Sequence, residues 1–141
     1  MLASTHIIAG VALASLMEGN LAAMAVTAVF AILPDIDTAN SFFGRRVPII
    51  PQLLKHRGVT HSLLMLVIEH GLTNHYFGPD WALYCTLGWA SHIILDMCNP
   101  AGVQLFWPHS RKVGMPLIRT GSIWEFVLAV LIASVGIKIN I

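Results

Sequence analysis

Five apolar stretches separated by polar loops dominate this sequence and leave few options for its fold. They cover residues 2–17, 21–33, 62–77, 81–98 and 122–140. Hydrophobic residues make up 56% of the chain and charged residues only 11%, whereas about 25% of the residues of an average soluble domain are charged. A soluble domain of 141 residues exposes a large share of its surface to water, and so few charged residues could not cover the apolar side chains of this chain. The stretches therefore predict helices whose outer faces are solvated by lipid.

The predicted fold is all-α: a single integral membrane domain over residues 1–141, arranged as a polytopic bundle of about five short transmembrane helices. Several stretches are shorter than the ~20 residues that comfortably span a bilayer, so local thinning or shielding by neighbouring helices is expected. The turn formers around Gly19 and Asn20 predict that the first two helices form a hairpin. The alternative, one helix over residues 2–33, would be about 48 Å long and would place Glu18 near mid-bilayer.

The basic residues are concentrated in two of the loops. Seven of the eight Lys and Arg residues lie in loops 34–60 and 99–121, and none lies in the loop around Pro79. Five crossings would put both basic loops on the same side as the N-terminus, and the positive-inside rule makes that side cytoplasmic. The chain has no basic arm of the kind that binds nucleic acid. We therefore expect a multi-pass protein without a nucleic-acid partner.

On this topology, histidines and aspartates from four helix ends meet at the cytoplasmic face. They are His6, Asp35, Asp37, His56, His61, His92 and Asp96. His92 and Asp96 are four residues apart, so they project from the same side of one helix. Imidazole nitrogens and carboxylate oxygens are ligands for Zn²⁺, Mn²⁺ or Fe²⁺, and a carboxylate can bridge two ions. Seven candidates exceed the needs of one tetrahedral site, which favours two ions, or one ion with supporting residues.

Taken singly, these residues have simpler interpretations. His92 and Asp96 could form a helix-stabilising pair, and Asp35 and Asp37 could belong to a solvated turn. Joint placement favours a metal site, because independent surface residues would scatter over both faces of the bundle. The predicted metal ligands are His6, Asp35, Asp37, His61, His92 and Asp96.

Three residues are predicted to act in catalysis. Asp35 is counted here as well as among the ligands. His56 could protonate a leaving group as a general acid, and Arg57 could hold an anionic oxygen with two parallel hydrogen bonds.

Three other polar residues each allow two interpretations. Glu69 and His70 lie mid-helix, where they could pair with each other or line a water-filled cavity. Glu125 follows Ser122 at the spacing of a capping box, and it also enters from the side of the predicted site. It is therefore either a helix cap or an accessory ligand.

Three segments resemble the YdjM-like family of predicted membrane-bound, metal-dependent hydrolases. They are LPDIDTANSFFGRR, HRGVTHS and GWASHIILDMCNPAGVQLFWP, and the similarity extends from His6 to about Glu125. The resemblance implies a bacterial inner-membrane location, metal-dependent hydrolysis and expression under LexA control. The positions that match the family motifs are His6, Asp35, Asp37, His56, Arg57, His61, His92 and Asp96.

These observations predict a hydrolase at the cytoplasmic membrane surface. Membrane lipid is its expected partner, and a phosphoester of a phospholipid or other lipid-linked headgroup is its expected substrate, because the site lies at headgroup depth beside basic loops. Two other classes of function stay open: transport of metal ions, and a non-catalytic role in which the metal ties the short helices together. The sequence does not specify an oligomeric state.

Overall fold

The chain folds into a bundle of helices in the computed structural model, which describes residues 1–138. In chain order the helices are α1 (Ala3–Leu16), α2 (Leu21–Ile32), α3 (Ile49–Leu53), α4 (Leu63–Phe77), α5 (Pro79–Met97) and α6 (Ile123–Lys138). Three 3₁₀ turns connect them: η1 (Leu33–Asp37), η2 (Gly44–Arg46) and η3 (Val59–His61). The described residues contain one isolated β-bridge, between Val103 and Val113, and no strand. The all-α prediction is confirmed.

Each predicted apolar stretch forms a helix, namely α1, α2, α4, α5 and α6. The observed ends agree with the predicted ends to within two residues. Residues 139 and 140, the last two of the predicted fifth helix, lie outside the described residues. The start of α4 is fixed by its own N-cap: the Ser62 hydroxyl accepts a hydrogen bond from the Met65 amide at 3.2 Å.

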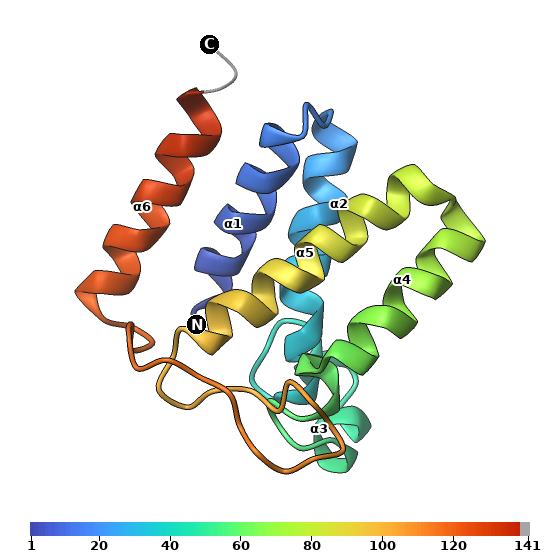
Figure 1. Cartoon of the computed structure of the whole chain (residues 1–141), viewed down its shortest axis with the longest axis vertical. Coiled ribbons are helices and arrows are strands. Elements are labelled where there is room, and N and C mark those ends of the chain that lie inside the picture. The colour runs from blue at the N-terminus through green and yellow to red at the C-terminus, as the bar shows by residue number, and fades with distance from the viewer. Residues whose placement is uncertain (139–141) are drawn as a thin grey trace.

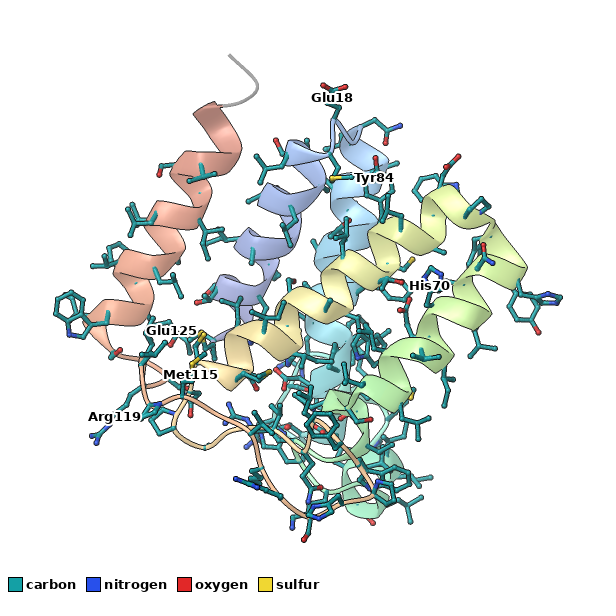
Figure 2. All side chains as sticks on the ribbon, viewed as in Figure 1. Glu18, His70, Tyr84, Met115, Arg119 and Glu125 are labelled. Carbon is teal, nitrogen blue, oxygen red and sulfur yellow. The ribbon has the colours of Figure 1, made fainter. Side chains whose placement is uncertain are left out.

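The first two helices form the predicted hairpin. Asn20 caps α2 by accepting a hydrogen bond from the Ala23 amide at 3.0 Å, and the Gly19 amide closes α1 on the carbonyl of Ala14 at 2.9 Å. Glu18 adopts a left-handed backbone conformation with φ of 56°. Figure 2 shows Glu18 at the tip of this turn, at the end of the bundle opposite Met115 and Arg119.

Helices α1, α2 and α5 pack against one another in the middle of the bundle, with α4 against α5 and α6 against α1 (Figure 1). Small residues allow this close packing. A Cβ atom at Gly88 of α5 would lie only 2.4 Å from the carbonyl oxygen of Thr27 in α2. The absence of a side chain at Gly88 therefore sets the spacing between α5 and α2, and with it the position of the C-terminal part of α5.

None of the helices within residues 1–138 is both long enough and apolar enough to cross a membrane. The prediction of membrane-spanning helices is therefore not supported. Helices α1, α2, α4 and α6 have 14, 12, 15 and 16 residues, fewer than the ~20 that span a bilayer. Helix α5 has 19 residues but carries His92 and Asp96.

The distribution of side chains is the reverse of that in an ordinary soluble domain. Buried polar side chains outnumber buried apolar ones in the described part of the chain, and the largest fully buried side chains include His6, His61 and His92. Large apolar side chains point outward instead, as Val67 on α4 and Phe126 on α6 do at 69% and 68% exposure. The polar interior lies mainly at the end of the bundle that holds the 3₁₀ turns.

Candidate metal centre

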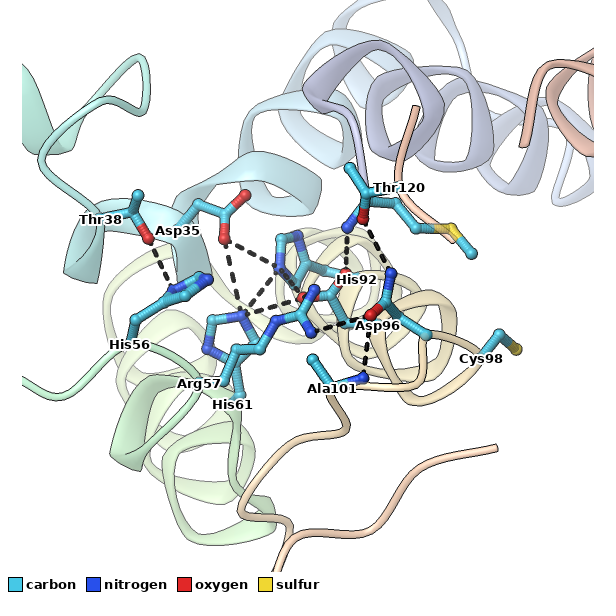
Figure 3. Close-up of polar contacts among 12 residues, drawn as sticks. Asp35, Thr38, His56, Arg57, His61, His92, Asp96, Cys98, Ala101 and Thr120 are labelled. Atoms are coloured by element: carbon cyan, nitrogen blue, oxygen red, sulfur yellow. Dashed lines mark hydrogen bonds and ion pairs between the residues drawn. The ribbon is translucent and has the colours of Figure 1, made fainter. Parts of the chain in front are cut away.

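Four segments bring histidines and aspartates together at this end of the bundle, and Figure 3 shows residues from three of them, namely η1, the segment before α4, and α5. Pro34 ends α2 in the turn η1, which presents Asp35 and Asp37. The segment before α4 carries His56, Arg57 and His61, helix α5 contributes His92 and Asp96 from its last two turns, and α1 contributes His6. All eight residues predicted for the site are therefore found in one region of the molecule.

The inner ligand group consists of Asp35, His61, His92 and Asp96. One ligand atom from each residue lies within 4.8 Å of the others. The Nε2 atoms of His61 and His92 are 3.0 Å apart, and Asp35 Oδ1 lies 3.7 and 3.6 Å from them. Asp96 Oδ2 approaches the same two nitrogens at 3.7 and 3.9 Å. Two imidazoles and two carboxylates thus converge on one point, as a divalent cation requires.

Hydrogen bonds on the far side of each imidazole fix the orientation of these rings. The Nδ1–H of His92 donates to the carbonyl of Ala31 at 2.7 Å, which leaves its Nε2 with a lone pair. His61 Nδ1 lies 2.9 Å from the Thr60 hydroxyl and 3.3 Å from Asp37 Oδ2. Two Nε2 lone pairs at 3.0 Å repel each other unless a cation or a proton lies between them. The residues therefore fit a metal ion.

The ionisation of the site agrees with this role. Burial by itself lowers the pKa of His61, but hydrogen bonds to Asp35 and Asp37 outweigh it and raise the pKa. Burial likewise raises the pKa of Asp35, but the hydrogen bonds to His61 and His92 hold that pKa well below its usual range. Asp37 has a lowered pKa too, because its bonds to His56 and His61 outweigh burial. A metal ion bound here would compete with protons for the His61 imidazole.

The outer ligand group consists of Asp35, Asp37 and His56, whose ligand atoms also lie within 4.8 Å of one another. His56 Nδ1 is 2.9 Å from Asp37 Oδ1 and 2.6 Å from the Thr38 hydroxyl. The His56 side chain is 46% exposed, in contrast to the inner histidines. Because Asp35 belongs to both groups, its carboxylate could bridge two ions.

Asp37 also positions its neighbours. Its Oδ2 accepts hydrogen bonds from the Arg57 amide at 3.0 Å and from the Thr60 hydroxyl at 2.5 Å. Arg57 itself has a left-handed backbone conformation with φ of 62°. Thus one carboxylate oxygen holds the 57–60 segment in place, and the other faces His56.

His6 lies beside the inner group and lacks a hydrogen-bond partner. It is completely buried, and within the described residues neither of its ring nitrogens has a partner. Its ring stacks on that of His92 at 3.8 Å, and its Nε2 is 3.5 Å from Asp96 Oδ1. The amino group of Met1 bonds to the same oxygen. A buried imidazole without partners is costly, and its position beside Asp96 makes His6 available as a further ligand.

Arg57 links this centre to an open cavity. Its guanidinium pairs with Asp96 Oδ2 at 3.0 Å and donates to Asn99 at 3.4 Å. The residue is only 7% exposed, and its buried Nε has no hydrogen-bond partner among the described residues. The cavity has a volume of about 560 Å³, and its polar lining consists of Asp35, Thr38, Asn40, Ser41, Arg45, His56, Arg57, Asp96 and Thr120. A ligand of this cavity would contact both ligand groups.

The sequence of the chain matches the YdjM inner membrane protein family over residues 1–140. The chain belongs to this family. It is 39% identical over 105 residues to the uncharacterized protein YvsG of Bacillus subtilis, an alignment that covers 70% of this chain and 65% of YvsG. It is 38% identical over 97 residues to the inner membrane protein YdjM of Escherichia coli K12, covering 62% of this chain and 50% of YdjM.

The chain thus spans between half and two-thirds of the length of these relatives. No solved structure matches it significantly. The resemblance drawn from the three sequence segments is confirmed, and these segments supply seven of the eight residues at the centre, all but His6.

Several residues of the site were not predicted. Thr38 directly follows Asp37, and its hydroxyl contacts the imidazole of His56. Thr60 directly precedes His61 and contacts its imidazole. Their adjacency to motif residues was a signal for a supporting role. Arg45 could be found only from the fold, because nothing in its local sequence distinguishes it from Arg46.

The remaining polar residues of the sequence analysis have local partners. Glu125 is buried, and its carboxylate accepts hydrogen bonds from the Gly121 and Leu2 amides, both at 2.6 Å, and from the Thr5 hydroxyl at 3.0 Å. Ser122 caps α6 by accepting from the Glu125 amide at 3.3 Å. Only half of the predicted capping box is therefore present, because the Glu125 carboxylate accepts from the Gly121 amide while the Ser122 amide donates to the Arg119 carbonyl. The Glu125 carboxylate also ties α6 to the start of α1.

Glu69 and His70 lie between α4 and α5, away from the metal centre. The Thr86 hydroxyl donates to Glu69 at 3.2 Å and lies 2.9 Å from His70 Nδ1. Thr73 also donates to Glu69, at 3.3 Å. Glu69 and His70 are thus joined through Thr86 rather than paired directly, and the cluster joins the two helices.

Proposed function

We propose that this chain is a metal-dependent hydrolase that cleaves a phosphoester of a lipid headgroup at the cytoplasmic face of the bacterial inner membrane. The observation that carries the proposal is the pair of imidazole Nε2 atoms 3.0 Å apart that converge with Asp35 and Asp96 beside the open cavity. The Ala31 carbonyl accepts a hydrogen bond from His92 Nδ1, and the Thr60 hydroxyl and the Asp37 carboxylate contact His61 Nδ1. These contacts orient the imidazoles in advance, which is the arrangement typical of metal sites.

The inner group would hold one ion, zinc, manganese or iron, and Asp35 and Asp37 of the outer group would hold a second. A divalent cation in such a site lowers the pKa of a coordinated water from about 15.7 to about 7. In the reaction a water oxygen forms a bond to phosphorus and the bond from phosphorus to the alcohol oxygen breaks. The attacking water gives up a proton, and the departing alkoxide oxygen takes one to become the alcohol.

Two residues of the cavity suit the remaining steps. Arg57 has an unpartnered Nε–H that can donate to a phosphoryl oxygen, while its other nitrogens hold Asp96 and Asn99. His56 is half exposed at the cavity and hydrogen bonded to Asp37, which keeps its ring oriented to protonate the leaving alcohol. If His56 instead binds the second ion, this proton must come from water.

The membrane location rests on the surface of the molecule and on the family. Large apolar side chains are exposed along α4 and α6, including Val67, Tyr76, Ile123 and Phe126, and extensive exposed apolar surface marks contact with lipid or protein. The related YdjM of Escherichia coli is named an inner membrane protein. The basic residues 45, 46 and 55 lie in the segment that joins η1 to His56, and a concentration of basic residues beside the site supports the cytoplasmic side in this proposal.

The test uses the full chain purified in detergent, loaded with zinc, manganese or iron in turn, and assayed on phospholipid and phosphomonoester substrates. We expect metal-dependent release of the alcohol or phosphate, lost in His92→Ala and Asp96→Ala. His75→Ala, which changes an exposed histidine of α4 far from the centre in sequence and fold, should behave as the wild type. Unchanged turnover in the first two variants would refute the assignment.

The burial of the inner group favours a second candidate, a purely structural metal. His61, His92 and Asp96 are at most 1% exposed and come from η3 and α5, and Asp35 adds η1. An ion there would tie three segments together. Metal-dependent stability without hydrolysis of any phosphoester would favour this role over catalysis.

A further inference from the structure

Residues 38–46, which we call the Arg45 loop, contribute a further part of the lining of the cavity that Arg57 and His56 also line. Thr38, Asn40, Ser41 and Arg45 all line the cavity. Each of these side chains offers a hydrogen-bond donor, and none belongs to either ligand group. Apart from Thr38, which contacts His56, the Arg45 loop therefore gives the cavity polar side chains whose function the metal centre does not explain.

The Arg45 loop is held in a defined conformation. The Gly44 amide donates to the Ser41 hydroxyl at 2.9 Å, and the Arg45 amide donates to the Ser41 carbonyl at 3.3 Å. Gly44 is buried so closely against the loop that a Cβ atom there would lie 2.0 Å from the Thr38 carbonyl oxygen. Thr38 in turn contacts His56 Nδ1 at 2.6 Å. The loop is thus fastened to the metal centre through Thr38 and His56.

The two arginines of the loop are oriented differently. The guanidinium of Arg46 stacks 3.9 Å from the centre of the Phe42 ring and donates to the Phe42 carbonyl. Arg45 lies farther from that ring, at 5.8 Å, and lines the cavity. Within residues 1–138, Arg57 is the only arginine that forms an ion pair with a carboxylate. Arg45 therefore brings an uncompensated positive charge to the cavity.

The charges of the site show what this arginine can bind. The three carboxylates of Asp35, Asp37 and Asp96 are more than balanced by Arg57, the Met1 amino group and one divalent cation. The charge of Arg45 then remains, and a second cation would add to it. A guanidinium on a cavity wall binds phosphate oxygens through charge-assisted, often bidentate, hydrogen bonds. Arg57, which lines the same cavity, offers a separate buried donor in its unpartnered Nε.

We infer that Arg45 binds a second anionic group of the ligand, so that the cavity selects a diphosphate ester over a monophosphate ester. One phosphoryl group lies between Arg57 and the ligand groups, and the other lies against the Arg45 loop. This inference rests on the proposed function for the identity of the first phosphoryl group. It concerns binding, so it can be tested without turnover.

The test compares the dissociation constants of dodecyl phosphate and dodecyl diphosphate for the metal-loaded full chain in detergent, measured by calorimetry. We expect the wild type to bind the diphosphate about tenfold more tightly or better, as one added charge-assisted contact requires. Arg45→Ala should reduce this ratio to near one. Arg46→Ala removes an equal charge from the same loop and should keep the ratio of the wild type.

Three results would overturn the inference: no preference in the wild type, a preference that survives in Arg45→Ala, or an equal loss in Arg45→Ala and Arg46→Ala. The last would indicate general attraction to a basic loop. The metal content of each variant is measured in parallel, and Arg45→Lys, which keeps the charge but loses the paired donors, should give an intermediate ratio. Inorganic pyrophosphate separates the ligand sources, because weaker binding than dodecyl diphosphate indicates a lipid-linked ligand and equal binding a water-soluble one.

Hydrolysis is scored separately. If the wild type hydrolyses dodecyl phosphate and shows no preference in binding, the proposed function stands and the role of Arg45 is refuted. If the preference is present and depends on Arg45 but no phosphoester is hydrolysed, the role of Arg45 stands and the proposed function is refuted.

Discussion

The two ligand groups share Asp35 but differ in how the protein surrounds them. In the inner group, His61 and His92 are fully buried and each has its Nδ1 held by a fixed partner, the Thr60 hydroxyl and the Ala31 carbonyl. In the outer group, His56 is 46% exposed at the cavity and its partner Asp37 is occupied on one side by the 57–60 segment. The burial of the inner group suits an ion that stays bound, whereas the exposure of His56 in the outer group leaves it accessible from the cavity.

The largest effect is expected where the inner group is broken. His92→Ala removes a ligand whose position is set by two helices, and it leaves His61 and Asp96 without their shared partner. We expect loss of bound metal and of hydrolysis well beyond the 10–100-fold cost of losing a supporting residue. Elemental analysis of the purified variant measures the first, and the phosphoester assay measures the second. Retention of all metal would show that the inner group is not the site.

A more selective effect is expected in the outer group. His56→Ala should lower the rate of hydrolysis by roughly 10²–10⁴-fold, the usual contribution of a general acid, while the inner ion remains bound. Metal analysis of this variant sharpens the comparison between the groups. Loss of one of two equivalents would make His56 a ligand of a second ion, and loss of all metal would mean that the two groups form one inseparable site.

The contrast between the groups also explains what could be read from the sequence. The helices and the arrival of His61, His92 and Asp96 at one end follow from local patterns, because apolar runs set the helices and the motif residues lie at their ends. The contacts of His92 with the Ala31 carbonyl and of Arg45 with the cavity depend on how distant segments pack, which no local pattern records. The prediction of membrane-spanning helices lacks support for a different reason. An apolar run predicts contact with lipid, but it does not determine whether the helix crosses the bilayer.

Thr60 tests whether the inner group is held by its surroundings. Its hydroxyl contacts both Asp37 Oδ2 and His61 Nδ1, so Thr60→Val keeps the shape of the side chain but removes both contacts. We expect a roughly 10–100-fold loss of metal affinity without loss of stoichiometry at saturating metal. Thr73→Val is the matched control, because Thr73 is equally buried but bonds within α4. Equal metal affinities in the two variants would contradict the role of Thr60.

The smallest effect at the metal centre is expected for Glu125, the buried carboxylate that lies nearby without belonging to either group. Glu125→Gln replaces one of the two accepting oxygens with an amide NH₂, which accepts no hydrogen bond. The side chain can then accept either from Gly121 or from Leu2 and Thr5, but not from both sides. We expect a loss of about 1–3 kcal/mol in unfolding free energy, measured by thermal denaturation in detergent, with unchanged metal content. A fall in metal stoichiometry would make Glu125 an accessory ligand, and it would extend the inner group from α5 toward α6. Unchanged stoichiometry would instead limit the inner group to its four converging residues. It would show that burial near the centre is not by itself sufficient for a role in binding the ion.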